Sequence, residues 1–206
     1  MFINLLLVFT FAFATVFAAA NPTNDIHQID FKNNFAYRPW CLRPGDRNDE
    51  VDQWQLSNQG ESVVVTNGVF QDSNQLDFRV CDISYGDLIG DDTDEAIVVT
   101  VCNTGGTGNF SEGYIYGMQA GKPRLLAVIP GGDRAYGGIA KATVEKGLLR
   151  VERHGTSGPA PFPEWIETRN YRLQGSQLKQ VGFARRGEAK SITEPCGVDY
   201  RAKYSR

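Results

Sequence analysis

The sequence predicts an all-β protein, an antiparallel meander of roughly nine or ten strands with few or no helices. Short runs of β-branched and aromatic residues recur along the chain, each bounded by turn residues. An amphipathic helical pattern is almost absent. The most apolar run outside the N-terminus, Ala96 to Cys102, has turn residues on both sides and indicates a strand buried on both faces. We expect a barrel-like or strongly twisted sheet.

Ten segments carry the strand pattern. The first two flank Asn67-Gly68, a dipeptide that accepts the positive φ angles of a type I′ turn and therefore predicts a hairpin. In the third, the apolar alternation changes phase, which predicts a β-bulge near Val80 and Cys81. The segments are 62–66, 69–70, 76–85, 96–102, 114–118, 124–129, 139–144, 148–153, 165–173 and 178–183.

The chain divides into four parts: a signal peptide (1–20), an irregular lead-in packed on the core (21–60), an antiparallel β domain (61–184) and a C-terminal tail tied by Cys196 (185–206). The uncharged run from Phe2 ends in three alanines, the small-residue pattern at which signal peptidase cuts. A retained N-terminal anchor is the alternative, because about 19 apolar residues could just span a bilayer. The lead-in would use its aromatic residues, Phe31, Phe35, Tyr37, Trp40 and Trp54.

The net charge is −3, and the two signs are interspersed without a basic block. This argues against nucleic acid as a partner. After cleavage we expect a monomer without membrane attachment, secreted to the extracellular space or to the periplasm of a Gram-negative bacterium. Asn109 heads the only glycosylation triplet, which would be used only in a eukaryotic host.

Four cysteines in an exported chain predict two disulfides, with three possible connectivities. A hairpin centred near Asp91 and Asp92 would place Cys81 opposite Cys102, close enough to bridge. Cys41 would then pair with Cys196. The bulge expected near Cys81 would blur this register.

An acidic turn precedes the apolar strand. The pattern Asp87-x-x-Gly-Asp91-x-x-x-Glu95 resembles the calcium loop of FG-GAP (integrin-type) repeats. The resemblance implies one calcium ion held by Asp87, Asp91 and Glu95, with the carbonyl of Thr93 as a further ligand. The chain departs from that pattern where Ile89 and Asp92 replace a ligand and a glycine. The alternative is a solvated turn without any cofactor.

A wider resemblance covers residues 80–175. The runs YGDLIGDDTDEAIVV, NTGGTGNFSEGYIY, GGDRAYGGI and PEWIETRNYRL are similar to small exported proteins, mostly bacterial, with a Y-G-D-L-x-G-D-G core. That family implies secretion and a compact single domain. It implies no activity and no substrate.

Catalytic residues cannot be assigned from the sequence. Only His27 and His154 could serve in a Ser-His-Asp arrangement, and there is no G-x-S-x-G elbow. The alternative we keep is a secreted hydrolase whose site is assembled from Asp133, Arg134, His154 and Glu164.

Two long connections could instead bind a partner. Prolines stiffen the loop 155–165, which also carries Glu164 and the aromatic anchors Phe162 and Trp165. Asp133 and Arg134 lie in the other connection. We therefore expect a secreted, disulfide-stabilised, non-catalytic β-domain that binds or inhibits an extracellular protein or glycan.

Overall fold

The computed structural model describes residues 24–42, 62–73, 76–105, 108–133, 136–157, 163–188 and Cys196. These residues form eleven β-strands and two short 3-10 turns, η1 (Ile26–Gln28) and η2 (Trp40–Leu42), with no α-helix among them. The predicted all-β antiparallel class is confirmed, although the sheets stay open and do not close into a barrel. None of the described segments forms a helix that could cross a lipid bilayer.

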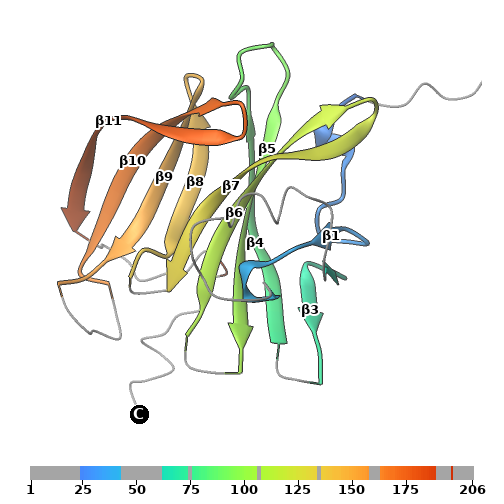
Figure 1. The fold of residues 1–206 in the computed structure, drawn as a ribbon, viewed down its shortest axis with the longest axis horizontal. Coiled ribbons are helices and arrows are strands. Elements are labelled where there is room, and N and C mark those ends of the chain that lie inside the picture. Colours follow the sequence, from blue (N-terminus) through green and yellow to red (C-terminus); the bar gives the residue numbers. More distant parts are fainter. Residues whose placement is uncertain are drawn as a thin grey trace, which may run out of the picture.

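The strands build two main sheets and one small one (Figure 1). The five-stranded sheet has the order β3-β4-β5-β6-β7, the four-stranded sheet has the order β11-β10-β9-β8, and β1 pairs with β2. The strands are β1 (Ala36–Tyr37), β2 (Val63–Val64), β3 (Val69–Gln71), β4 (Leu76–Gly86), β5 (Glu95–Thr104), β6 (Phe110–Gln119), β7 (Lys122–Asp133), β8 (Ile139–Glu145), β9 (Leu148–Gly155), β10 (Trp165–Gln174) and β11 (Gln177–Glu188).

The central strand β5 is buried on both faces, as its sequence predicts, and every residue from Glu95 to Cys102 is buried. Successive side chains point to opposite faces of a strand. Ala96 and Val98 therefore join one hydrophobic core, and Ile97 and Val99 join the other.

Aromatic residues of the N-terminal segment cover the first face of the five-stranded sheet. Phe31 and Tyr37 are almost fully buried, and Tyr37 lies 5.3 Å from Phe78 and 5.4 Å from Tyr114, ring centroid to ring centroid. The Tyr37 hydroxyl donates to the Phe31 carbonyl at 2.6 Å, which satisfies the polar end of a buried ring. The expected packing of the lead-in on the core is present here, whereas Trp54 lies outside the described residues.

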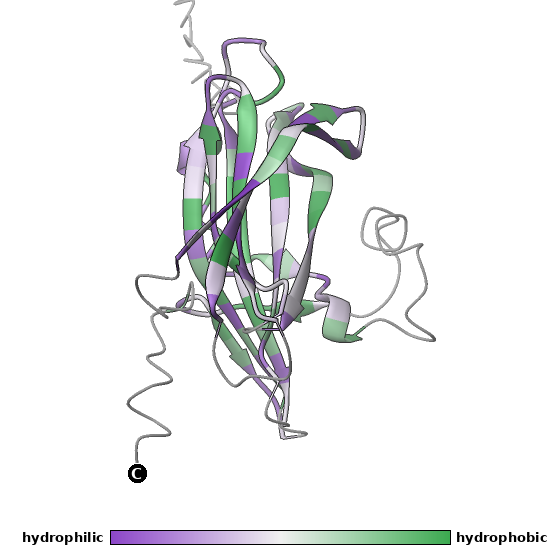
Figure 2. Cartoon of the chain, turned by 90° about the vertical axis from the view of Figure 1, so that its left-hand side faces the viewer, coloured by the Kyte–Doolittle hydropathy of each residue, from purple (hydrophilic) through white to green (hydrophobic). Residues whose placement is uncertain are grey.

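The four-stranded sheet covers the second face, with apolar residues of β8 and β9 packing against β5, β6 and β7. The two sheets approach each other closely where β4 meets β8. A Cβ atom on Gly86 would lie 2.7 Å from the Val144 Cβ, so only glycine fits there. Next to it the Ser84 hydroxyl donates to the Ala142 carbonyl at 2.8 Å. Bands of hydrophobic and hydrophilic residues follow one another along the strands (Figure 2).

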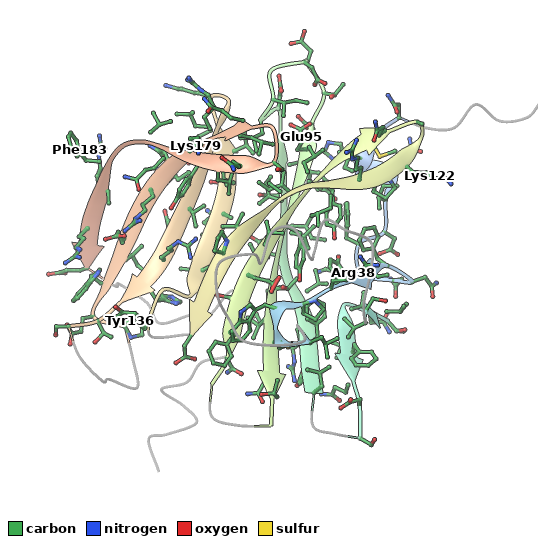
Figure 3. All side chains as sticks on the ribbon, in the orientation of Figure 1. Arg38, Glu95, Lys122, Tyr136, Lys179 and Phe183 are labelled. Carbon is green, nitrogen blue, oxygen red and sulfur yellow. A yellow bond between two sulfur atoms is a disulfide. The ribbon has the colours of Figure 1, made fainter. Side chains whose placement is uncertain are left out.

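At the outer edge of the four-stranded sheet, β11 exposes nearly all its side chains. Phe183 and Lys179 project away from the strand (Figure 3).

The Asn67-Gly68 turn forms, but the hairpin predicted around it does not extend. Asn67 and Gly68 have φ angles of 52° and 75°, as a type I′ turn requires, and Thr66 bridges Val69. Beyond that bridge the arms separate, because β2 pairs with β1 and β3 pairs with β4.

The β-bulge predicted near Val80 and Cys81 is confirmed by a register shift between Val80 and Asp82. The β4–β5 hairpin is centred one residue earlier than predicted, between Gly90 and Asp91, because Gly86 pairs with Glu95. Beyond the bulge Cys102 lies opposite Phe78 and not opposite Cys81.

The predicted disulfide pairing is wrong for the same reason. All four cysteines are bonded, but the bonds are Cys41–Cys102 and Cys81–Cys196. Cys102 faces the core that the N-terminal segment covers, and Cys41 packs against that core. One bond therefore fixes the N-terminal segment to β5, and the other fixes the C-terminal segment to the bulge of β4.

Replacing both Cys41 and Cys102 by serine should lower the free energy of unfolding by about 4 kcal/mol, because the bond closes a long loop in the unfolded chain. Urea denaturation of the double variant measures the loss. Peptide mapping without reduction should recover Cys41 linked to Cys102. Recovery of Cys81 linked to Cys102 would contradict the pairing.

Candidate functional site

In the acidic turn between β4 and β5, Asp87 binds the backbone of its own loop. Its carboxylate accepts N–H groups from Gly90 at 2.6 Å, Asp91 at 3.2 Å and Asp92 at 3.1 Å. These donors would otherwise need water. Asp87 therefore holds the shape of the turn, as Asp side chains do in many loops.

The other predicted calcium ligands also bind within the turn. Asp91 accepts the Thr93 N–H at 3.0 Å, and Glu95 accepts the N–H of Leu88 at 2.9 Å. Among the described residues no three His, Cys, Asp or Glu side chains gather where they could hold a metal ion. Calcium binding stays a prediction, since a carboxylate that accepts a backbone N–H keeps further lone pairs for a cation.

Glu95 is the buried member of the turn, with 1% of its surface exposed. Burial raises the pKa of this carboxyl above its ordinary value, and the nearby Asp91 and Asp87 add to that effect. The backbone N–H groups of Leu88 and Ile89 act in the opposite direction. Ionising Glu95 in the folded protein is therefore costly, and the two backbone donors offset part of that cost.

A contact that the sequence does not indicate ties this turn to the N-terminal segment. His27 Nε2 lies 2.9 Å from Asp94 Oδ2, and the His27 ring lies 4.1 Å from the Tyr85 ring. The two residues of the pair are far apart in the chain and in separate local patterns, so only the folded structure brings them together.

The residues of the hydrolase hypothesis lie in segments that meet through their backbones. Asp133 ends β7 and His154 belongs to β9, so neither lies in the connection predicted for it, and Glu164 directly precedes β10. His154 donates its N–H to the Gly138 carbonyl at 2.8 Å, and Glu164 donates its N–H to the Gly155 carbonyl at 2.8 Å. The Asp133 carbonyl in turn accepts the N–H of Gly138 at 2.9 Å. The three chain segments are thus neighbours.

Their side chains have separate roles. Asp133 accepts the N–H of Asn109 at 3.0 Å, and Glu164 accepts the Ser157 hydroxyl at 2.7 Å. This second bond is the largest cause lowering the pKa of the Glu164 carboxyl. His154 is 3% exposed, so a dissolved substrate has almost no access to its ring.

The two connections predicted to bind a partner are described only in part, because Arg134 of one and Phe162 of the other lie outside the described residues. Trp165 is half-buried at the start of β10, with the Arg186 guanidinium 4.7 Å from its ring centroid. The indole covers Gly155, where a Cβ would lie 2.2 Å from Trp165 Nε1. Trp165 therefore packs along the sheet.

Asn109, the predicted glycosylation residue, lies just before β6 and accepts the Asn103 side-chain amide at 2.9 Å. Its glycosylation stays a prediction.

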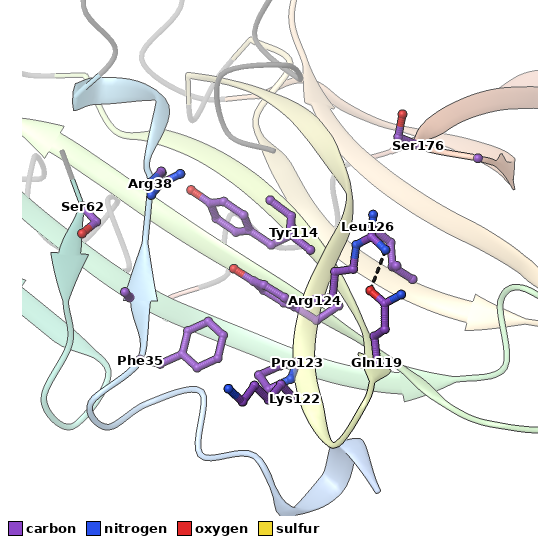
Figure 4. Close-up of a pocket in the computed structure, with 14 residues that line it drawn as sticks. Phe35, Arg38, Ser62, Tyr114, Gln119, Lys122, Pro123, Arg124, Leu126 and Ser176 are labelled. Atoms are coloured by element: carbon purple, nitrogen blue, oxygen red, sulfur yellow. Dashed lines mark hydrogen bonds between the residues drawn. The ribbon is translucent and has the colours of Figure 1, made fainter. Parts of the chain in front are cut away.

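A cavity of about 990 Å³ lies where β6 and β7 meet the N-terminal segment (Figure 4). Its described walls include Tyr114 and Tyr116 of β6, Phe35 and Arg38 of the N-terminal segment, and the five consecutive β7 residues Lys122 to Leu126. We call it the β7 groove. The sequence marks this region only as a turn, Ala-Gly-Lys-Pro, between two strands.

The β7 groove follows the edge of the sheet. Consecutive strand residues point to opposite faces, so five in a row can line one cavity only if it runs along the strand edge. The packing of two neighbouring residues agrees with a groove along the edge. Leu125 packs against the core on the first face of the sheet, and Leu126 packs against the core on the second face. β7 is the last strand of its sheet among the described residues.

The charged side chains that line the groove all carry positive charge. Arg38, Lys122 and Arg124 line it, and no carboxylate is among its described lining residues. The Arg124 guanidinium donates to the Gln119 side chain at 2.6 Å, which holds it beside the hairpin. Such a surface favours an anionic ligand.

The wall that carries Arg38 is firmly held. Cys41, close behind Arg38 in the chain, is bonded to Cys102. Glu112 on β6 is buried, and its carboxylate accepts the Trp40 N–H at 2.7 Å. The groove is therefore largely pre-formed, which lowers the ordering cost of binding.

Comparison with protein-family models, curated proteins and solved structures gave no match, so the function has to be inferred from these residues.

Replacing Asp87 by alanine should lower the free energy of unfolding by about 1–2 kcal/mol, because three backbone N–H groups lose their acceptor. Urea denaturation in the presence of a chelator measures this loss. Asp92→Asn is the control, since asparagine suits the positive φ of 62° at this position. A loss seen only when calcium is present would instead make Asp87 a metal ligand.

Replacing Glu95 by glutamine should flatten the pH dependence of stability. Because the folded pKa is raised, the contribution of Glu95 is fully present below its unfolded pKa of about 4.5 and is lost as pH rises through the folded value. The variant should therefore gain stability relative to the parent from pH 4 to pH 7. Urea midpoints across this range test the sign, and an equal difference at every pH would contradict it.

Proposed function

We propose that this protein is an extracellular, non-catalytic binding module whose ligand is anionic and occupies the β7 groove. One observation carries the proposal: three cationic side chains line the groove, with no carboxylate among its described lining residues. Electrostatic complementarity of this kind selects partners and speeds their association. The partner is a protein or a glycan that carries the negative charge.

The proposed compartment rests on two features. Two disulfides within one domain are typical of oxidising, extracellular compartments. The N-terminal run from Phe2 to Ala20 has the character of a signal peptide, and we propose that it is removed after Ala20.

A hydrolase site at Asp133, His154 and Glu164 has less support. A general base must reach the proton that it removes from the substrate. The near-complete burial of His154 prevents this, and the carboxylates of Asp133 and Glu164 bind other groups.

The double variant Lys122→Glu, Arg124→Glu should weaken binding of anionic probes roughly tenfold or more, because it reverses two charges on one wall. Calorimetry with a glutamate-rich peptide and a uronic-acid oligosaccharide, each beside a neutral counterpart, measures the effect. Lys141→Glu on β8 is the matched control, since Lys141 is exposed and not among the groove's described lining residues. The proposal fails if neither anion binds, or if the double variant binds as the parent does.

A further inference from the structure

We infer that the ligand of the β7 groove is an extended peptide segment with alternating acidic and apolar side chains, which adds to the five-stranded sheet as a strand beside β7. This inference rests on the proposed function, because it names the partner of the same site. It follows from the place of β7 at the edge of its sheet among the described residues, from the different chemistry of its two faces and from the burial of the tyrosines.

The edge of β7 offers main-chain groups to such a strand. A two-residue turn, Ala120-Gly121 with φ angles of 50° and 74°, joins β6 to β7, and Gln119 pairs with Lys122 across it. This closing pair directs the Lys122 main chain toward β6. The main-chain groups of Pro123 and Leu125 then point away from β6 and into the groove.

Pro123 fits this arrangement, because proline is tolerated in a strand where its nitrogen faces away from the neighbouring strand. The edge therefore presents the carbonyl of Pro123 and both the N–H and the carbonyl of Leu125. Among the described residues no backbone hydrogen bond joins this stretch to a segment other than β6. A peptide strand can pair with all three groups.

The two sides of the edge differ in chemistry. Leu125 and Tyr116 belong to the first face, where Phe35 packs edge-on against Tyr116 with ring centroids 5.1 Å apart. Lys122 and Arg124 alternate with Leu125 along the strand, so they lie on the opposite face. Since a bound strand alternates in the same way, its apolar side chains would meet the aromatic face and its acidic side chains the cationic face.

A sugar ligand fits less well. Recognition of a pyranose ring by aromatic stacking requires an exposed ring face, but Tyr114 is 1% exposed and Tyr116 is 6% exposed. Main-chain donors and acceptors along a strand edge match another extended main chain directly. We therefore argue for the peptide and let the experiment decide against the glycan.

The test uses the full mature chain and the peptide Ac-(Glu-Val)₃-Glu-NH₂. Two further versions carry N-methyl groups, one at every valine and one at every glutamate. Alternate N–H groups of a strand point to opposite edges, so one N-methylated peptide should lose at least tenfold in affinity while the other binds as the parent peptide does. The block peptide Ac-Glu₄-Val₃-NH₂, with the same composition, should bind at least tenfold more weakly.

Hydrogen exchange followed by NMR gives a second readout, because the Leu125 amide should become protected when the alternating peptide binds. Equal affinity for both N-methylated peptides, or an unprotected Leu125 amide in the complex, would overturn strand addition. Binding of the uronic-acid oligosaccharide without binding of the peptide would overturn the inference and leave the proposed function standing. If neither probe binds, the proposed function fails as well.

Discussion

The burial of β5 on both faces is the constraint on which the rest of the structure depends. A strand with apolar side chains on both faces needs two covers, and each fully buried Val or Ile contributes about 1.5–3 kcal/mol only if water is excluded from it. The four-stranded sheet provides one cover and the N-terminal segment the other. Both disulfides serve this arrangement, since Cys41–Cys102 holds the N-terminal cover directly against β5 and Cys81–Cys196 closes on the neighbouring strand.

Local features of the fold could be predicted from the sequence. Strand positions, the type I′ turn at Asn67-Gly68 and the bulge near Val80 depend on alternation and turn residues within a few positions of one another. The pairing of cysteines could not, because it depends on the register of β4 against β5 over their whole length, and a small error in the turn changes every partner. The β7 groove could not be predicted from the sequence either, since Arg38, Lys122 and Arg124 come together only when the N-terminal segment packs on the sheet.

The acidic turn shows why a ligand pattern is ambiguous in a single sequence. Asp and Glu oxygens can bind a cation, and they can equally bind backbone N–H groups of a tight loop. Asp87 and Glu95 do the second in this structure. What distinguishes Glu95 is its burial, which follows from its place at the first position of the most buried strand and not from the spacing of the acids.

The order of the segments along the chain limits when they can pack during synthesis. Residues 24–42 come before the strands that they cover, so during synthesis Phe31 and Tyr37 have no surface to pack on until β4 to β6 exist. Cys41 likewise cannot form its native bond until Cys102 has been made. Contacts between distant parts of a chain close slowly. The wall of the β7 groove that carries Arg38 can therefore be completed only once the strands behind it have been made.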